Sequence, residues 1–264
     1  MVELYHRFFF EPILNILIFF YNIVPGHDIG IAIILLTLLI KLVLLPFGAQ
    51  SIKSQKALQD IQPKLEELKR KYKDDKEKLA SETMKLYREQ KVNPLSSCLP
   101  LLIQFPFLIA VYQAFRTGLS TAELTTYSFI TNPGHINAIA FGLFDFSKPN
   151  IVIAILAGLS QYVQTKMLMT KRPKTADKGA KDEQLMASMN ASMQYFMPFL
   201  TILIGMQLPA GLSFYWLLTT ILTVIQQKFI FSKKTKPAIE IIPPSNTPPS
   251  TPSPAEPNQQ IASK

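Results

Sequence analysis

The chain has 264 residues, of which 48% are hydrophobic, with a mean hydropathy of +0.19 and a formal net charge of +9. This composition excludes a set of ordinary soluble domains and favours one polytopic membrane domain. The single cysteine, Cys98, excludes an internal disulfide and a metal cluster built from cysteines. The histidines show no ligand spacing, so we expect no metal site; they are His6, His27 and His135.

The first apolar segment, residues 8–24, has its polar residues on one side. At 100° per residue, an arc of about 80° contains all of them: Arg7, Glu11, Asn15 and Asn22. This pattern is typical of a helix that lies flat in the membrane interface. We therefore assign residues 1–28 to an external N-terminus with an interfacial amphipathic helix. A sixth span or an uncleaved signal anchor is the alternative, although it would require a nearly uncharged cytoplasmic start.

Five longer apolar segments each approach the roughly 20 residues that a helix needs to cross the hydrocarbon. They are residues 29–47, 95–115, 149–169, 193–208 and 211–230. The fourth is the shortest of the five. We predict an all-α membrane protein whose five transmembrane helices form a core over residues 29–231.

Basic residues predict the orientation of these spans. Residues 47–93 contain twelve Lys or Arg, whereas residues 117–148 contain only Lys148. Because Lys and Arg in short loops stay on the cytoplasmic side, the N-terminus should be outside and the C-terminus inside. The expected location is the cell (plasma) membrane, with several passes.

The polar segment between the first two spans has helical periodicity. Its apolar residues recur at intervals of three and four, first Ile61, Leu65, Leu68 and Tyr72, then Ala80, Met84 and Tyr87. We predict a cytoplasmic helical hairpin over residues 50–92, for which a simple solvated coiled hairpin is the plainest interpretation. After Pro237 the sequence is too rich in Pro and Ser to pack, so residues 232–264 are predicted to be a disordered cytoplasmic tail.

Lys41 lies inside the first predicted span, where a lone cation costs about 2.5–3.5 kcal/mol unless it faces water or a polar partner. Thr37 lies one helical turn away. Polar residues also form stripes on three other spans: Ser97 and Gln104; Gly158, Gln161, Gln164 and Thr165; Ser213, Trp216, Thr220, Thr223 and Gln227. Each stripe alone could serve ordinary interhelical hydrogen bonding. Together with the cation they favour one shared, hydrated groove.

Three segments closely resemble the YidC/Oxa membrane-insertase family. They are LLIKLVLLPFGAQSIKSQKALQDIQPKLEELKRKY, KVNPLSSCLPLLIQFPF and PAGLSFYWLLTTILTVIQQ. The resemblance implies a five-helix core with an outer interfacial helix and a cytoplasmic hairpin, in a short form without a large external domain. It also implies an insertase that takes nascent membrane proteins from the cytosol into the bilayer without a cofactor. Many members carry arginine where this chain has Lys41, so a cation with less defined geometry is expected here.

Carried over residue by residue, the resemblance implies a substrate groove at Lys41, Thr37, Gln161, Tyr215, Trp216 and Gln104. For Gln104 a purely structural role is an equal alternative. The implied partners are nascent membrane proteins, the ribosome and a targeting receptor, a protein-translocation channel and the lipid bilayer, but not DNA. The sequence offers no catalytic Ser, His and carboxylate arrangement, so we expect no enzyme. A small secondary transporter or channel that uses the same cavity is the alternative function, and a membrane scaffold is a third.

Overall fold

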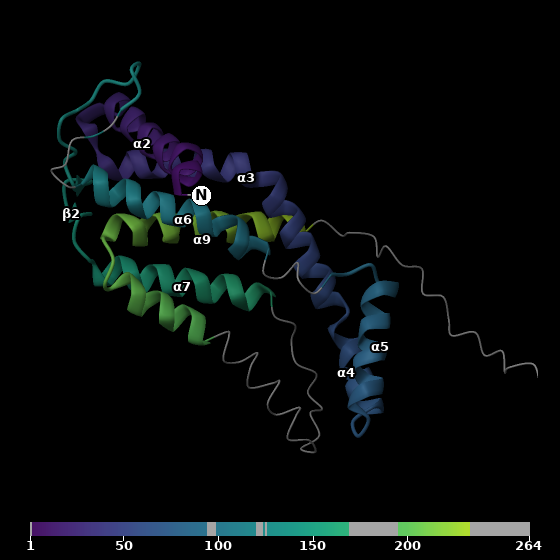
Figure 1. Cartoon of the computed structure of the whole chain (residues 1–264). Coiled ribbons are helices and arrows are strands. Elements are labelled where there is room, and N and C mark those ends of the chain that lie inside the picture. Colours follow the sequence, from purple (N-terminus) through teal and green to yellow (C-terminus); the bar gives the residue numbers. More distant parts are fainter. Residues whose placement is uncertain (1, 94–98, 120–123, 125, 169–194, 233–264) are drawn as a thin grey trace, which may run out of the picture. The chain divides into compact units, whose positions relative to one another are not determined.

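The structure is a computed structural model that describes residues 2–93, 99–119, 124, 126–168 and 195–232. These residues are mostly helical, and Figure 1 shows their order. The elements are α1 (Val2–Tyr5), η1 (His6–Phe10), α2 (Glu11–Ile23), η2 (Pro25–His27), α3 (Ile29–Asp60), α4 (Gln62–Lys71), α5 (Lys76–Glu89), α6 (Leu99–Gly118), β1 (Ile139–Ala140), β2 (Phe144–Asp145), α7 (Ile151–Leu168), a helix at Tyr195–Gly205, and α9 (Ala210–Ser232). Cys98 and the predicted tail beyond Ser232 lie outside the described residues.

Among the described residues, three helical segments are long and apolar enough to cross a membrane. They are Ile29–Lys71, Ile151–Leu168 and Ala210–Ser232, which correspond to the first, third and fifth predicted spans. The second predicted span corresponds to α6, a helix of 20 residues, and the fourth to the shorter apolar helix Tyr195–Gly205. The described residues are mostly helical, as the predicted fold class requires, and β1 and β2 add a short antiparallel pair that was not predicted.

Helix α3 extends well past the predicted end of the first span at residue 47. It begins where the Asp28 side chain accepts a hydrogen bond from the Ile31 amide at 3.1 Å, and it continues for 32 residues with Pro46 inside it. It ends at Asp60 because Pro63, at the start of α4, has no N–H to bond the carbonyl one turn earlier. Pro46 thus lies inside α3, whereas Pro209 directly precedes the start of α9.

Helices α4 and α5 pack on one another through a small apolar cluster of their own. Ile61, Leu65 and Leu86 are buried in it, and Leu68 is partly buried against them. The Asp75 carboxylate accepts a hydrogen bond from the Lys78 amide at 2.9 Å and so caps α5. Met84, one of the residues at helical spacing, is half-exposed, whereas Leu86 is buried in the cluster.

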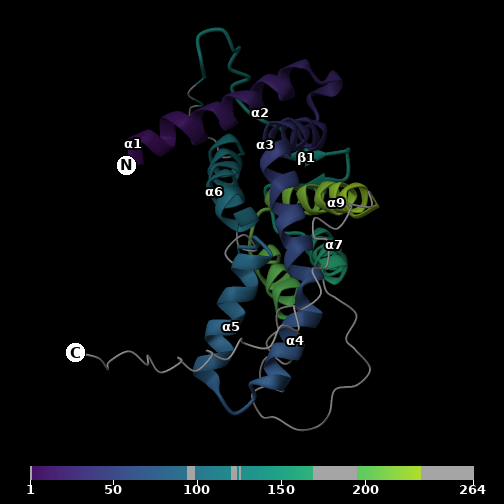
Figure 2. The same cartoon turned by 90° about the vertical axis from the view of Figure 1, so that its right-hand side faces the viewer.

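Helix α2 crosses α3 and α6 and packs its apolar residues against both (Figure 2). Its buried residues include Leu14, Leu17 and Ile18, which belong to the main core. Two residues of the predicted polar face are bonded to the segment before β1. Asn15 accepts a hydrogen bond from the Tyr127 amide at 2.7 Å, and Asn22 donates one to the Thr131 carbonyl at 2.7 Å. This face therefore holds a loop in addition to contacting solvent.

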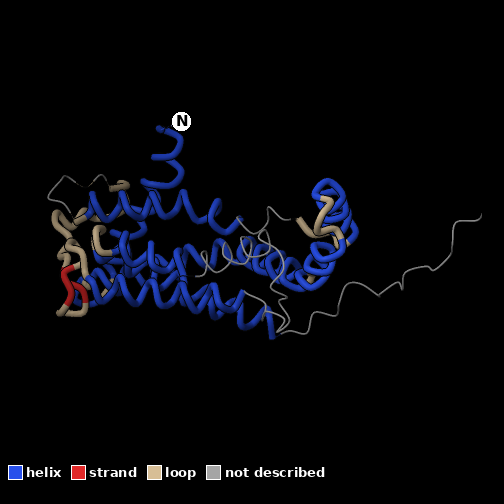
Figure 3. The backbone as a smooth tube through the Cα atoms, turned by 90° about the horizontal axis from the view of Figure 1, so that it is seen from below, coloured by secondary structure: helices blue, strands red, loops and turns tan. Residues whose placement is uncertain are grey.

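The short strands lie at one end of the helices, which we call the strand end (Figure 3). Here the Asp28 carboxylate also accepts a hydrogen bond from the Phe141 amide, at 2.5 Å. Phe141 has a positive φ of 55°, and its ring lies against Gly30 and near the Phe214 ring of α9, at 5.8 Å between centroids. One carboxylate thus joins the start of α3 to the β1–β2 turn.

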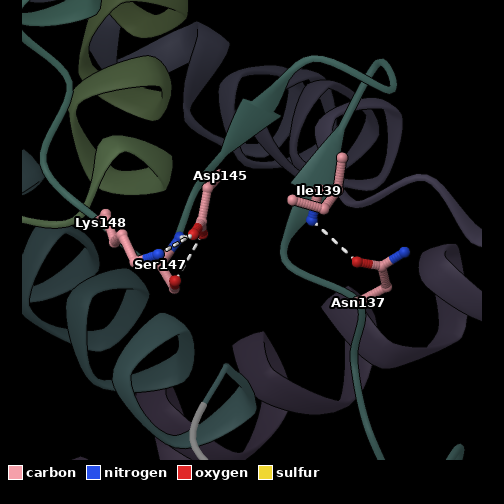
Figure 4. Close-up of polar contacts among 5 residues, drawn as sticks. All are labelled: Asn137, Ile139, Asp145, Ser147 and Lys148. Carbon is pink, nitrogen blue, oxygen red and sulfur yellow. Dashed lines mark hydrogen bonds and ion pairs between the residues drawn. The ribbon is translucent and has the colours of Figure 1, made fainter.

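The segment that follows β2 is bonded to the start of α9. The Ala210 and Gly211 amides donate to the carbonyls of Lys148 and Phe146, at 2.9 and 3.1 Å. Asp145, the last residue of β2, accepts hydrogen bonds from the Ser147 hydroxyl and amide through its carboxylate, which also pairs with the Lys148 ammonium (Figure 4). The Ser147 hydroxyl, followed by Lys148, lowers the pKa of Asp145 below its ordinary value. These bonds fix the loop that ties β2 to α7 and α9 at the strand end.

Gly30→Val should destabilise the strand end. A Cβ at this position would lie 2.5 Å from Cζ of Phe141 and 3.0 Å from Cβ of Ala140, so the Phe141 ring would be expelled from its contact. We expect a loss of about 1–3 kcal/mol in the free energy of unfolding, measured in detergent. Ile31→Val, on the exposed side of the same helical turn, is the control and should change it little.

Candidate functional site

Helices α3 and α9 lie side by side and run in the same direction. Near the strand end, Cδ1 of Ile33 lies 3.6 Å from the place that a Cβ on Gly211 would occupy. Further along, Lys41 bonds to Thr223, and still further the Lys56 ammonium lies 5.6 Å from the centre of the Phe231 ring. Because these contacts advance along both helices together, one continuous seam joins α3 and α9.

A cavity of about 260 Å³ opens along this seam, beyond the strand end. The residues that line it come from α3, α6, α7 and α9. Its polar lining residues are Lys41, Ser51, Gln55, Gln104, Gln161, Gln164, Tyr215, Trp216, Thr219, Thr220, Thr223, Gln226 and Gln227. Since a water molecule occupies about 30 Å³ of liquid, the cavity has room for several waters or for a short stretch of peptide.

Lys41 is half-buried at this cavity and has a specific partner. Its Nζ donates a hydrogen bond of 2.7 Å to the Thr223 hydroxyl, which itself donates to the Thr219 carbonyl at 2.7 Å. An ammonium group carries three N–H donors. The bond to Thr223 uses one of these N–H groups, so the other two can donate hydrogen bonds to water or to a carboxylate in the cavity.

The structure brings five of the six predicted groove residues to the cavity wall. Gln104 donates a hydrogen bond of 2.7 Å to the Tyr215 hydroxyl, which links α6 to α9. Gln161 accepts one from the Thr201 hydroxyl, which links α7 to the helix Tyr195–Gly205. Trp216 and Lys41 complete the set. These residues come from four separate helices, as a shared groove requires.

Thr37 is the predicted groove residue that does not line the cavity. Its side chain is 1% exposed, and its hydroxyl donates to the Ile33 carbonyl of its own helix at 2.6 Å. Thr37 lies on the strand-end side of Lys41, within packed apolar residues. Residues of this packed region are Ile33, Leu36, Ile40, Phe115 and Leu212, none of them more than 7% exposed. The cavity therefore stops near Lys41 and does not continue to the strand end.

Several residues of the predicted polar stripes serve helix packing instead. The Ser213 hydroxyl donates to the Gly205 carbonyl at 3.3 Å, and the Thr165 hydroxyl donates to the Gln161 carbonyl of its own helix. Gly158 lies against Pro198 and Ile202 on the neighbouring helix. Hydrogen bonding between or within helices therefore accounts for Ser213 and Thr165, and close packing accounts for Gly158.

Sequence reasoning missed the lining residues of α3 beyond Pro46. Ser51 and Gln55 continue the face of Lys41 and Gly48 at helical spacing, and both line the cavity. The signal was present, but the first span was expected to end at residue 47. Thr219 and Gln226 of α9, also lining residues, were missed for a different reason, because they flank the predicted stripe.

The chemistry of the cavity is that of one cation among neutral amides and hydroxyls. Within the described part of the chain, no group of three or more His, Cys, Asp or Glu side chains gathers to hold a metal. What the cavity can do is hold water and polar peptide groups and attract negative charge.

Comparisons with known proteins agree with this architecture. The family model of the 60Kd inner membrane protein matches residues 19–237. A protein of Fusobacterium nucleatum named membrane protein insertase YidC is 36% identical over 207 residues, which cover 78% of this chain and 87% of that protein. A protein of the same name from Clostridium tetani is 38% identical over 193 residues, which cover 73% of this chain and 76% of that one.

A crystal structure described as an active YidC insertase with its first transmembrane domain resolved is similar in fold. It matches with a TM-score of 0.50 and 25% identity, over 76% of this chain and 41% of that chain. Likewise, this chain matches only 38% of a Pelobacter propionicus protein of the same name. Given the family match over most of its length and the two relatives that it covers by more than two thirds, this chain belongs to the YidC membrane-insertase family, that of the 60Kd inner membrane protein.

Proposed function

We propose that this chain inserts membrane proteins by receiving a hydrophilic segment of the substrate in the cavity beside Lys41. In this proposal five helices span the membrane, with the strand end outside and α4 and α5 in the cytosol. The twelve basic residues of 47–93 support this orientation. The proposal counts α6 and the helix Tyr195–Gly205 among the spans, because both supply residues to the same packed bundle.

The observation that carries the proposal is the hydrogen bond from Lys41 to Thr223 at the wall of the cavity. A cation in the hydrocarbon layer is costly, so a chain retains one where it meets water and polar groups. Here a hydroxyl accepts one N–H, and the cavity leaves room for water or a carboxylate at the others. A segment with acidic residues would be attracted to this position.

The direction of insertion follows from the closed strand end. A hydrophilic segment that enters from the cytosol can leave bulk water without meeting lipid directly. The adjoining apolar segment of the substrate then moves into the bilayer, which releases about 25 cal/mol for each Å² of apolar surface buried. In this account, hydrophobic burial drives insertion and the cavity lowers the barrier.

The partners follow from the same account. Nascent membrane proteins and the lipid bilayer are required by insertion itself. The basic surface of α4 and α5 could receive the ribosome or a targeting receptor, or contact anionic lipid head groups. We extend the proposal to a protein-translocation channel as a partner for larger substrates. A solute transporter or channel is not favoured, because the relatives are named insertases.

Insertion by the purified protein tests the proposal. Liposomes that contain only this chain should insert a model substrate with one apolar span and a short acidic outer segment, measured by protection of that segment from added protease. Liposomes with the same lipids and no protein should give little protection. Equal protection in both would remove the proposed function, and release of a trapped solute without protection would instead favour a channel.

A further inference from the structure

The cavity is unusually rich in carboxamides. Six of its lining residues are glutamines: Gln55, Gln104, Gln161, Gln164, Gln226 and Gln227. Among the described lining residues, Lys41 is the one that carries a charge. A carboxamide offers the same donor and acceptor pair as a peptide group. The wall is therefore matched to the main chain of a polypeptide at least as well as to any particular side chain.

Gln227 differs from most of these glutamines because its amide is unused. It is 0% exposed, and neither Nε2 nor Oε1 has a hydrogen-bond partner among the described residues. By contrast, Gln104 bonds to Tyr215, and Gln226 donates to the Leu45 carbonyl at 3.3 Å. A buried amide without partners costs about 1–3 kcal/mol, so its retention needs an explanation.

Two further groups on α3 line the same cavity and have no hydrogen-bond partner within the described part of the chain. They are the Ser51 hydroxyl, in a side chain that is 1% exposed, and Oε1 of Gln55. Gly48, one turn before Ser51, lies against the Gln226 side chain, with its Cβ position 3.3 Å from Nε2. Ser51 and Gln227 therefore occupy neighbouring turns of the α3–α9 seam.

We infer that Gln227, with Ser51 and Gln55, binds main-chain peptide groups of the substrate's hydrophilic segment. This inference rests on the proposed function and adds the class of group that is bound. The three torsions of the Gln227 side chain let its amide turn into the cavity, where it can donate to one peptide carbonyl and accept from a peptide N–H. Because every residue except proline carries both groups, this site serves segments that have no carboxylate.

The position of this site suggests that the substrate contacts the cavity in two steps, first at the amide site and then at Lys41. Ser51 follows Lys41 by ten residues, which is about 15 Å along a helix, and it lies farther from the strand end. A segment that enters from the cytosol meets the neutral amide site first. The cation at Lys41 then selects among segments by their charge, farther in.

The test compares two substrates that differ only in the outer segment, which is acidic in one and built from Ser, Gly and Asn in the other. Each is inserted into liposomes that contain the full chain, as parent, Gln227→Met, Lys41→Gln or Gln113→Met. Methionine is close to glutamine in volume but has no amide. Gln113→Met is the matched control, because its Oε1 is also buried without a partner among the described residues but does not line the cavity.

We expect Gln227→Met to lower the insertion of both substrates by about fivefold, which corresponds to one net hydrogen bond. Its thermal midpoint should equal or exceed that of the parent, since an unpartnered amide has been removed. Gln113→Met should insert both substrates like the parent. Unchanged insertion by Gln227→Met would overturn the inference, and so would a midpoint that falls together with insertion, because it would reveal a structural amide. Lys41→Gln should lower the insertion of the acidic substrate more than that of the neutral one. If neither changes, the role of Lys41 in the proposed function fails, whatever the result for Gln227→Met.

Discussion

Lys41→Glu should strongly lower the insertion of substrates with acidic outer segments, whereas Lys41→Arg should retain most of it. The reversal replaces attraction by repulsion at the one cation of the described cavity wall. Two unit charges 4 Å apart interact by about 1 kcal/mol in water and by about 4 kcal/mol near a protein surface, so a decrease of about tenfold or more is expected. Arginine keeps the charge, and its planar fork can bind a carboxylate with two hydrogen bonds.

Protease protection of the outer segment in liposomes measures this effect. A substrate with a basic outer segment is the control, and Lys41→Glu should insert it at least as well as the parent does. The electrostatic account would be contradicted if Glu and Arg at this position inserted the acidic substrate equally well. It would also be contradicted if Lys41→Glu and Lys41→Arg each lowered the insertion of the acidic and the basic substrate by the same factor.

Gly158→Leu should have the largest effect on the fold. A Cβ on Gly158 would lie 2.9 Å from the carbonyl oxygen of Pro198, and a backbone atom cannot swing away as a side chain can. The helix Tyr195–Gly205 would have to move off α7, at a cost of about 3 kcal/mol or more. The move would also separate Thr201 from Gln161 and so distort the cavity wall.

Two measurements would detect the effect of Gly158→Leu. The thermal midpoint in detergent should fall, and the emission of Trp216, the one tryptophan of the chain, should shift because it lines the cavity. Leu156→Ala is the control, since Leu156 lies on the same helix and is 46% exposed. A midpoint for Gly158→Leu that matches this control would contradict the close packing of the two helices.

Much of the fold follows from apolar length and helical periodicity. Residues 29–47, 149–169 and 211–230 were each predicted as a span from their hydropathy, and the described helices that are long and apolar enough to cross a membrane are Ile29–Lys71, Ile151–Leu168 and Ala210–Ser232. The end of α3 could not be predicted from the sequence, because proline usually ends or kinks a helix. Here Pro46 is tolerated within a helix of 32 residues. The strands β1 and β2 were not predicted, because two residues each are too few to show an alternation of apolar and polar side chains.

The site was predicted from polar residues in an apolar background. Polar groups in hydrocarbon seek each other or water, so Lys41, Gln104 and Gln161 were expected to lie together. All three line the cavity. It failed for Thr37 and Ser213, whose hydroxyls bond to nearby carbonyls. Threonine and serine can satisfy themselves within a helix bundle, whereas lysine cannot, so the charged residue was the more reliable guide.

The central claim is that the cavity beside Lys41 contains water that is continuous with the cytosol and is sealed from the strand end. Thiol labelling from each side of the membrane tests it, with Thr220→Cys in the cavity wall and Ser213→Cys in the packed region, both in a Cys98→Ser background. The account predicts that a membrane-impermeant reagent labels position 220 only from the side of α4 and α5, and labels position 213 from neither side. Labelling of position 220 from the strand end, or from neither side, would contradict it.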